Sequence, residues 1–257
     1  MEVAAAGPSV RLSLVIPCYN EEAALPVSMP PLIAACAKLG VSYELVMVNN
    51  GSWDATPQRI DEFIAQGLPV KRVDVPVNKG FGWGVICGLR ASAGEYLGYA
   101  CADGQVSPED ILSIYQSVVK AGPGSIAKAW RVKRQDGGLR GLTSWGYNAL
   151  FTLIYGRITP DVNGVPKFLA RADLERLDPL SPDSFIDPEL MFKARILGMK
   201  IVEVPVTFLR RQGGRSTVKV LKTSMEFVRN LLGYRRRADF REWRRKLDAN
   251  KGVSHAS

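Results

Sequence analysis

Apolar runs and helical patterns alternate along the first half of the sequence, and this alternation constrains the fold more than any other feature. Patterns typical of helices lie between the apolar runs, at Ala23–Leu39, Thr56–Gln66, Gly82–Ala93 and Pro108–Ala121. The runs themselves are rich in β-branched residues, as buried strands are, and occur at Leu12–Ile16, Tyr43–Val48, Val70–Val75, Tyr96–Ala100 and Ser125–Ala129. Strands that alternate with helices predict βαβ units, and therefore an α/β fold with a mostly parallel sheet flanked by helices.

The chain is long enough for one globular domain with a full core, because it has 257 residues and is 46% hydrophobic. No run of about 18 apolar residues occurs, so we expect no transmembrane helix, and the first residues do not have the pattern of a secretory signal. The only histidine is His255, which argues against a Ser-His triad or a histidine metal site. The cysteines have no zinc-site spacing and are expected to be free thiols in a reducing compartment; they are Cys18, Cys36, Cys87 and Cys101.

A second region runs from about residue 131 to residue 210. It begins with a polar, glycine-rich loop at Lys133–Gly141, which is followed by a predicted helix at Leu142–Tyr155. Two motif-bearing turns and a strand at Ile201–Leu209 complete the region. We place a domain boundary after this region, with residues 1–216 as the main domain and residues 217–257 as a helical extension.

The net charge of +9 is concentrated near the C-terminus. The segment Arg210–Leu247 holds thirteen Lys and Arg against three Asp and Glu, whereas the rest of the chain holds twenty-one against twenty-two. A basic segment predicts contact with a polyanionic surface, and we expect anionic lipid headgroups as the partner and no nucleic acid.

Apolar residues recur at helical spacing through Thr217–Leu247, with basic residues on much of the opposite side. We expect the first half of this segment to pack on the domain and the second half to lie on a membrane surface. The alternative is a helix packed on the domain throughout, with its basic face in solvent. The apolar positions are Leu221, Met225, Val228 and Leu232 in the first half, and Phe240, Trp243 and Leu247 in the second.

Polar residues follow the first two predicted strands, at the end where open α/β sheets bind ligands. Pro17-Cys18-Tyr19-Asn20-Glu21 leads from a strand into a helix, and the free amides of a helix start suit the polar parts of a nucleotide. An ordinary turn capped by Asn20 is the simpler alternative. After the second strand, Asn49 and Asn50 can form a tight turn or hydrogen bond to a base or ribose, and Asp54 can cap the next helix.

A glycine-rich stretch, Asn78–Gly84, follows the third strand. It is not a dinucleotide fingerprint, because Val85 and Cys87 stand where that motif needs glycine, and no phosphate-binding GKS or GKT sequence occurs. We therefore expect these glycines to permit close approach of the backbone to a ligand or a neighbouring segment.

Asp103 follows the fourth strand in the string Ala102-Asp103-Gly104-Gln105. Mg²⁺ is commonly held by one or two carboxylates, with substrate phosphates and water as the other ligands. Asp103 can therefore hold Mg²⁺ or Mn²⁺ against a diphosphate, although a turn or helix-capping aspartate is the plain alternative.

Taken together, these motifs resemble a family 2 glycosyltransferase with the GT-A fold, most closely the polyprenyl-phosphate sugar synthases of the dolichyl-phosphate mannose synthase type. The resemblance covers roughly residues 11 to 220. It rests on seven strings in the family's order: IPCYNEE, VNNGSWDAT, NKGFGWGVICGL, ADGQ, DVNGVPKFLAR, FIDPELMFKARILGMKIVEVPVTFLRR and GGRST.

The resemblance implies roles for particular residues. Asp103 would bind the metal, and Lys167 would approach the phosphates of the donor. Arg210 or Arg211 would act with a mobile loop, formed by Gly214, Arg215 and Ser216, over the diphosphate. The residues expected to bind the nucleotide are Pro17, Tyr19, Glu21, Asn49, Asn50, Lys79, Ala102, Asp103 and Gln105.

The chain departs from the family pattern at two places. Asn49 and Asn50 stand where the family usually has two aspartates, which removes charge and adds amide donors. Cys101 stands where the metal motif usually has a second carboxylate, and a neutral thiol does not bind Mg²⁺ well.

The resemblance implies an inverting transfer of a sugar from a nucleotide-sugar to an acceptor, and the basic C-terminal segment favours a polyprenyl phosphate as that acceptor. For a saccharide hydroxyl the reaction would need a base, for which Asp187 and Glu189 are the candidates; both are also typical helix-start carboxylates. Two alternatives stay open: a soluble glycosyltransferase that acts on a sugar hydroxyl of a saccharide or glycoconjugate, and a catalytically weakened nucleotide-binding relative. We expect a cytoplasmic protein, with peripheral attachment to the inner face of the membrane.

Overall fold

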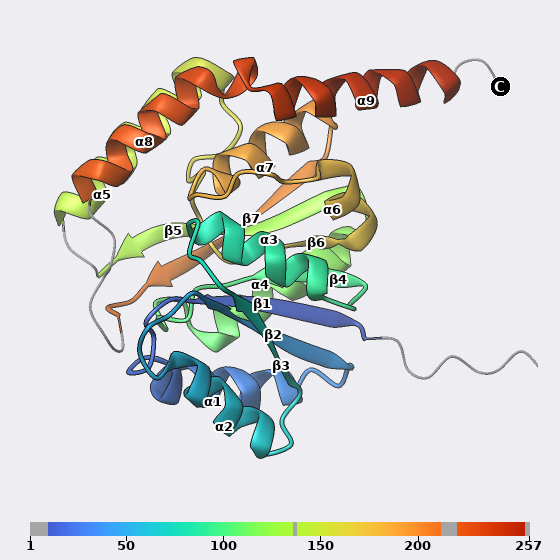
Figure 1. The fold of residues 1–257 in the computed structure, drawn as a ribbon. Helices are drawn as coiled ribbons and strands as arrows, with labels where there is room; N and C mark the ends of the chain where they lie inside the picture. Colours follow the sequence, from blue (N-terminus) through green and yellow to red (C-terminus); the bar gives the residue numbers. More distant parts are fainter. Residues whose placement is uncertain (1–9, 136–137, 212–219, 255–257) are drawn as a thin grey trace, which may run out of the picture.

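The computed structural model describes residues 10–135, 138–211 and 220–254, and within them the predicted α/β fold is confirmed. Seven strands form one sheet in the order β3-β2-β1-β4-β6-β5-β7 (Figure 1). The strands are β1 (Leu12–Cys18), β2 (Tyr43–Asn50), β3 (Val70–Val75), β4 (Tyr96–Tyr99), β5 (Ser125–Arg134), β6 (Lys167–Ala170) and β7 (Lys200–Phe208).

All strands run parallel except β6, which pairs antiparallel with both β4 and β5. The sequence did not predict β6, because it has only four residues and follows Pro166 directly. Its antiparallel direction matters for function, because the first residue of β6, Lys167, pairs with Tyr99 at the carboxyl end of β4.

Helices cover both faces of the sheet because alternate strand residues point to opposite sides. In β1, Leu14 and Ile16 face a core formed with α1 (Leu25–Ala37), α2 (Thr56–Ala65) and α4 (Pro108–Ala121). Val15 faces the other core, formed with α3 (Phe81–Ala91), α5 (Gly138–Tyr155), α6 (Arg171–Leu177), α7 (Ile186–Ile196), α8 (Val220–Gly233) and α9 (Ala238–Ser254).

Several local predictions can be compared with the structure. Ser107 caps α4 as its sequence indicates, since its Oγ accepts a hydrogen bond from the Asp110 amide at 3.1 Å. The region from about residue 131 to residue 210 also holds two helices that were not predicted by their bounds, α6 and α7. Asp187 and Glu189 lie in the first turn of α7, as expected of helix-start carboxylates.

The C-terminal helices differ from the predicted division of the basic segment, although the side chains of Leu221 and Met225 lie outside the described part of the chain. In α9, Phe240 and Trp243 are buried against α7, with the Trp243 side chain only 6% exposed, so the prediction that this half lies on a membrane was wrong. In α8, by contrast, Leu232 is 64% exposed and Val228 is also exposed. A short 3₁₀ turn, Tyr234–Arg236, joins the two helices, and burial of Tyr234 anchors it to the domain.

Candidate functional site

The candidate site lies where the order of the strands reverses along the sheet. From β1 the chain builds outward through β2 and β3, and it then returns to place β4 on the other side of β1. The loops after β1 and β4 therefore diverge at the carboxyl edge, the place where open α/β sheets usually bind ligands. Glu21 follows β1 and Asp103 follows β4, so the sheet brings these two acidic residues to one place.

The turn after β1 is fastened to the loop after β2 through Asn20. The Asn20 amide donates to Ser52 Oγ at 3.2 Å, and its side-chain oxygen accepts from the Trp53 amide at 3.0 Å. Asn20 has a positive φ of 56° and does not cap a helix, since α1 begins only at Leu25. Pro17 and Tyr19 flank this turn and are both partly exposed at the sheet edge.

Asn49 and Asn50 have different surroundings although they are adjacent. Asn49 donates to Asp74 at 2.9 Å and accepts from the Ser52 amide, so it organises the loop after β2. Asn50 is buried and donates to the Gly80 carbonyl at 3.0 Å, while its own oxygen has no protein partner. Asp54 accepts from the Thr56 amide at 3.0 Å just before α2, but the N-cap residue of this helix is Ala55, so the prediction that Asp54 caps it was wrong by one position.

The glycine-rich stretch before and within α3 packs against backbone. A Cβ at Gly80 would lie 2.6 Å from the Pro182 carbonyl oxygen, and a Cβ at Gly82 would lie 2.3 Å from that of Ser181. Close approach to a neighbouring segment is thus what these glycines permit. Lys79, at the same turn, lies over the Trp83 ring at 4.7 Å.

Arg211 joins Glu21 and Asp103 at this edge of the sheet. Its guanidinium forms a close ion pair with Glu21 and lies 3.6 Å from the Asp103 carboxylate. Burial raises the pKa of Glu21, an effect that Arg211 opposes and the charge of Asp103 reinforces. Arg210 is exposed, whereas Gly214, Arg215 and Ser216 lie outside the described residues.

Gln105 ties this arrangement to the strand that precedes Arg211. Its side-chain nitrogen donates to the Leu209 carbonyl at 3.0 Å, and its own carbonyl accepts from the Leu209 amide at 2.8 Å. Ala102 is buried beside Asp103, and its carbonyl accepts from Ser28 of α1. The loop after β4 is therefore held from both sides.

The residues present fit a divalent ion that shares its ligands with a substrate. Within residues 10–135, 138–211 and 220–254, no three acidic, cysteine or histidine side chains are grouped so that they could hold a metal. Asp103 and Glu21 nevertheless offer hard oxygen donors, and Mg²⁺ is usually bound by one or two carboxylates plus phosphates. Cys101, two residues before Asp103, offers only a thiol, which suits softer metals.

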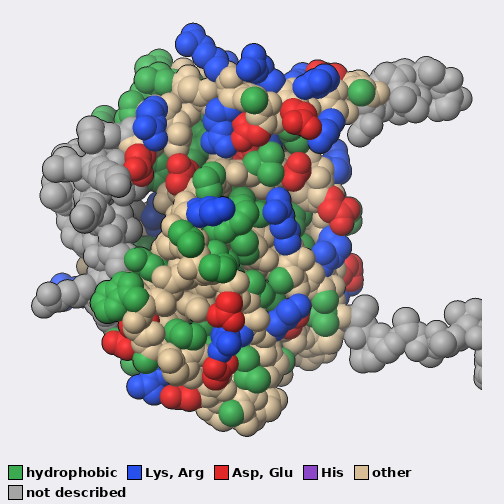
Figure 2. Space-filling model, in the orientation of Figure 1, with side chains coloured by type: hydrophobic (Ala, Val, Ile, Leu, Met, Phe, Trp, Pro, Cys, Tyr) green, Lys and Arg blue, Asp and Glu red, His purple; other side chains and the backbone are tan. Residues whose placement is uncertain are grey.

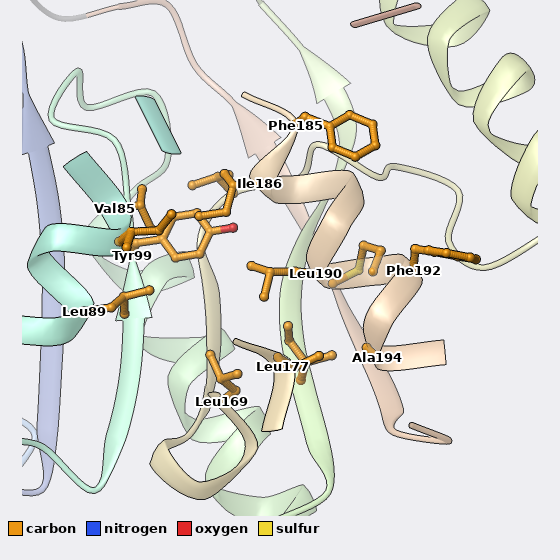
Figure 3. Close-up of a cluster of buried hydrophobic side chains, with 14 of the residues drawn as sticks. Val85, Leu89, Tyr99, Leu169, Leu177, Phe185, Ile186, Leu190, Phe192 and Ala194 are labelled. Atoms are coloured by element: carbon orange, nitrogen blue, oxygen red, sulfur yellow. The ribbon is translucent and has the colours of Figure 1, made fainter. Parts of the chain in front are cut away.

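Lys167 and Asp187 form a buried ion pair beside this edge of the sheet. The Lys167 ammonium bonds to Asp187 and to the Gly164 carbonyl at 2.8 Å, and Tyr99 donates to the same Asp187 oxygen at 2.5 Å. Burial lowers the pKa of Lys167, which the charge of Asp187 opposes. Figure 3 shows the Tyr99 ring between Val85 and Leu89 of α3 and the first turns of α7, which carry Asp187.

Glu189 is placed differently from Asp187, although only one residue separates them. Its carboxylate accepts from the backbone amides of Leu180 and Ser181 and from the Tyr234 hydroxyl at 3.1 Å, and it pairs with Lys193 at 2.8 Å. The side chain is buried and surrounded by these donors. These partners give it a role in holding the Leu180–Ser181 loop and the turn between α8 and α9.

Further buried charges that the sequence analysis missed lie next to Lys167. Lys128 of β5 pairs with Lys167 across the sheet and is fully buried, and burial together with the neighbouring ammonium lowers its pKa to about 8. Arg131 donates three hydrogen bonds to Asp161, two from its guanidinium and one from its backbone amide. These bonds and the charge of Arg131 outweigh the effect of burial and lower the pKa of Asp161 to about 2. In the sequence, the only sign of these buried charges is a lysine or arginine in or next to an apolar predicted strand.

Comparison with known proteins places the chain in a family. The model of the family described as "Glycosyl transferase family 2" matches residues 13–177. The chain is 29% identical over 215 residues to the undecaprenyl-phosphate 4-deoxy-4-formamido-L-arabinose transferase of Pectobacterium atrosepticum. It is also 29% identical over 217 residues to the protein of the same name from Klebsiella pneumoniae. These alignments cover 82% and 84% of this chain, which spans about 64% of the length of each relative.

Solved structures show the same fold. Glucosyl-3-phosphoglycerate synthase from Mycobacterium tuberculosis, in complex with Mn²⁺, uridine diphosphate and glucosyl-3-phosphoglycerate, superposes with a TM-score of 0.66 and 21% identity. The match covers 88% of this chain and 80% of the other. The same synthase in complex with Mg²⁺ and uridine diphosphate gives a TM-score of 0.64 and 20% identity, over 88% of this chain and 79% of the other. Because the family model spans the sheet edge that carries Glu21, Asp103 and Lys167, the chain belongs to glycosyl transferase family 2.

Proposed function

We propose that this protein transfers a sugar from a nucleotide-sugar to the phosphate of a polyprenyl carrier, with inversion at the anomeric carbon. The observation that carries the proposal is the pair Glu21 and Asp103, brought together with Arg211 at the switch point of the sheet. The names of the relatives from Pectobacterium and Klebsiella support a polyprenyl-phosphate acceptor.

The donor would lie with its nucleoside over the turns after β1 and β2 and with its diphosphate beside Asp103. Pro17, Tyr19 and the Asn49–Ser52 turn lie on this side of the proposed site. A divalent ion held by Asp103 would supply charge that stabilises the leaving nucleoside diphosphate. Arg211 would add a second positive charge, which matters because negative charge grows on the leaving oxygen.

In this reaction an acceptor phosphate oxygen forms a bond to the anomeric carbon while the bond to the diphosphate oxygen breaks. The electron pair of the broken bond leaves with the nucleoside diphosphate. A phosphate acceptor is already anionic, so no base has to remove a proton. The surroundings of Asp187 agree with this, because one of its carboxylate oxygens already accepts hydrogen bonds from Lys167 and Tyr99. We propose that Asp187 positions Lys167, and that Lys167 contributes positive charge near the phosphates; we assign no base role to Glu189 and no phosphate contact to Arg210.

We further propose an anionic membrane surface as partner and assign it to the α5–α8 face, defined by Trp145, Leu153, Val228 and Leu232. The two helices lie side by side (Figure 1), with the Tyr147 and Phe227 rings 4.6 Å apart. Leu153 and Trp145 of α5 are 82% and 70% exposed, and Leu232 of α8 is 64% exposed, so large apolar side chains are exposed on two adjacent helices. Among the described residues, none of the helices is both long and apolar enough to cross a bilayer.

Positive charge borders this face. Arg229, Arg236 and Arg157 are exposed at or after the helices that carry it, and Figure 2 shows hydrophobic atoms at the upper left of the molecule, with Lys and Arg along its top. Apolar side chains flanked by arginines suit insertion among anionic headgroups. Attachment to the inner face of the membrane, and the boundary at residue 216, stay predictions.

A transfer assay with radiolabelled nucleotide-sugars tests the proposal. Vesicles that contain undecaprenyl phosphate are mixed with the protein, a divalent ion and, separately, uridine, guanosine, cytidine and thymidine diphosphate sugars. We expect lipid-soluble label with at least one donor, and loss of about 100-fold or more of it in Asp103→Asn. Glu109→Gln, an exposed carboxylate of α4, is the matched control and should retain transfer. Label in a free saccharide acceptor but not in the lipid would refute the polyprenyl acceptor.

A further inference from the structure

Arg211 pairs with both Asp103 and Glu21, the two carboxylates that would hold a divalent ion. One guanidinium nitrogen pairs with Glu21 and the other lies 3.6 Å from Asp103 Oδ2. All three side chains are largely shielded from solvent, with Arg211 22% exposed and the two carboxylates less so. Solvent therefore screens this arrangement only partly.

The position of Arg211 is set by the chain before it. Leu209 is bound to Gln105 through two hydrogen bonds, of 2.8 and 3.0 Å, and the Phe208 carbonyl accepts from the Gln135 amide at 2.8 Å. Arg211 is thus two residues from a fixed point and on the same side as the loop that carries Asp103.

We propose that Arg211 is a built-in counter-cation of the metal site, and that it couples binding of the metal to binding of the donor. The inference rests on the proposed function, because it takes the diphosphate and the divalent ion as ligands of this site. Arg211 neutralises the two carboxylates until the ion and the diphosphate arrive together, and it then pairs with the diphosphate.

Charge explains the coupling. Glu21, Asp103 and Arg211 together carry one net negative charge, so a divalent ion alone meets a site that is already largely neutralised. An ion that binds alone also displaces Arg211 from the two carboxylates, and it brings no anion to which the guanidinium could bind instead. When a diphosphate binds as well, Arg211 gains a new anionic partner, to which an arginine can bond in bidentate fashion. By linkage, each ligand must then strengthen binding of the other by the same factor.

Mn²⁺ binding, followed by electron paramagnetic resonance of the free ion, tests this directly. It is measured for the wild type and Arg211→Gln, with Mn²⁺ alone and with uridine, guanosine, cytidine or thymidine diphosphate in turn. We expect wild type to bind Mn²⁺ weakly alone and more tightly with one of the nucleotides. Arg211→Gln should bind Mn²⁺ alone about tenfold more tightly than wild type, and its gain on adding the nucleotide should shrink by a similar factor.

Two further variants test whether the effect on Mn²⁺ binding comes from the positive charge of Arg211. One keeps that charge on a different side chain, and the other removes a positive charge elsewhere in the protein. Arg211→Lys keeps the cation and should bind Mn²⁺ alone nearly as weakly as wild type. Arg90→Gln removes one positive charge from the last turn of α3, at the opposite edge of the sheet, and should leave Mn²⁺ binding unchanged. Arg211→Met serves in place of Arg211→Gln if circular dichroism shows that the glutamine variant does not fold.

The outcomes distinguish this inference from the proposed function. If Arg211→Gln binds Mn²⁺ alone no more tightly than wild type while the nucleotide still strengthens binding, the counter-cation role is refuted and the proposed function stands. If no nucleotide brings Mn²⁺ to wild type, and Arg211→Gln also fails to bind it, both are overturned.

Discussion

Two lysines lie side by side in the core, and they show what single residues contribute to this fold. Lys128 of β5 and Lys167 of β6 are register partners, and both are fully buried. Lys167 is neutralised by Asp187, whereas Lys128 bonds to the Ala129 carbonyl and lies 3.7 Å from Glu203. Burying an ammonium group is costly unless it is well paired, so burial of Lys128 costs more free energy than burial of Lys167.

The pH dependence of stability should reveal Lys128. Its pKa is lowered to about 8 by burial and by Lys167, whereas an unfolded lysine titrates near 10.4. Between these values the unfolded chain binds more protons than the folded one, so the free energy of unfolding should rise with pH from about 8 to about 10. Urea unfolding at several pH values measures this, and Lys128→Met should remove much of the rise. Lys71→Met, on the exposed side of β3, is the control and should leave the slope unchanged.

The Asp187 carboxylate allows a second prediction at this scale. Asp187→Asn leaves Lys167 buried without its counter-ion, and breaking a buried pair costs about 3 kcal/mol or more. Chemical denaturation should show this loss. The double variant Asp187→Asn with Lys167→Met should recover part of it, because no charge then stays buried; a double variant as unstable as the sum of the single variants would contradict the pairing.

At the scale of elements, the same amphipathic pattern led to two different environments. The sequence pattern of residues 217–247 has an apolar side along its whole length, but α9 turns that side to the core and α8 leaves Val228 and Leu232 exposed. The reason lies in the neighbours. The Phe192 ring of α7 lies 5.7 Å from the Phe240 ring of α9, whereas in α8 the Phe227 ring packs on Tyr147 of α5 and Val228 and Leu232 stay on the exposed side.

Binding to vesicles tests whether the α5–α8 face contacts an anionic membrane. Leu232→Glu together with Leu153→Glu should weaken co-sedimentation with vesicles of anionic lipid by about tenfold, because charges then replace two apolar contacts. The matched control is Val77→Glu with Ile64→Glu, two exposed apolar side chains outside this face. Equal binding by both double variants would show that the membrane contacts another surface, or none.

Helix α4 offers a prediction about capping. Ser107→Ala removes the acceptor for the Asp110 amide and should lower the free energy of unfolding by about 1 kcal/mol. Ser113→Ala, at an exposed position in the middle of the same helix, should have little effect. Thermal or urea unfolding of the two variants gives the comparison.

At the scale of the whole molecule, the C-terminal helices complete the core on one face of the sheet. Leu231, Tyr234, Phe240 and Trp243 belong to the same buried cluster as Phe185 of the α7 region. Trp243→Ala should therefore cost about 3 kcal/mol or more, whereas Trp145→Ala should change stability by less than about 0.5 kcal/mol, since Trp145 is exposed. A chain ending at residue 216 should unfold at lower denaturant than the full chain; equal stability would show that the extension adds nothing to the domain.

The sequence by itself determined the alternation of strands and helices, and hence the parallel sheet, because periodic burial is encoded in local residue order. It also placed Glu21 and Asp103 just after predicted strands, whereas Lys167 was indicated only by the resemblance to the family. Only the tertiary structure decided which strand ends meet, since the crossover from β3 to β4 makes β1 and β4 neighbours and joins Glu21 to Asp103 through Arg211. It likewise decided that β6 is a strand, that Lys128 is buried and that α9 packs inward, because each depends on a partner distant in the chain.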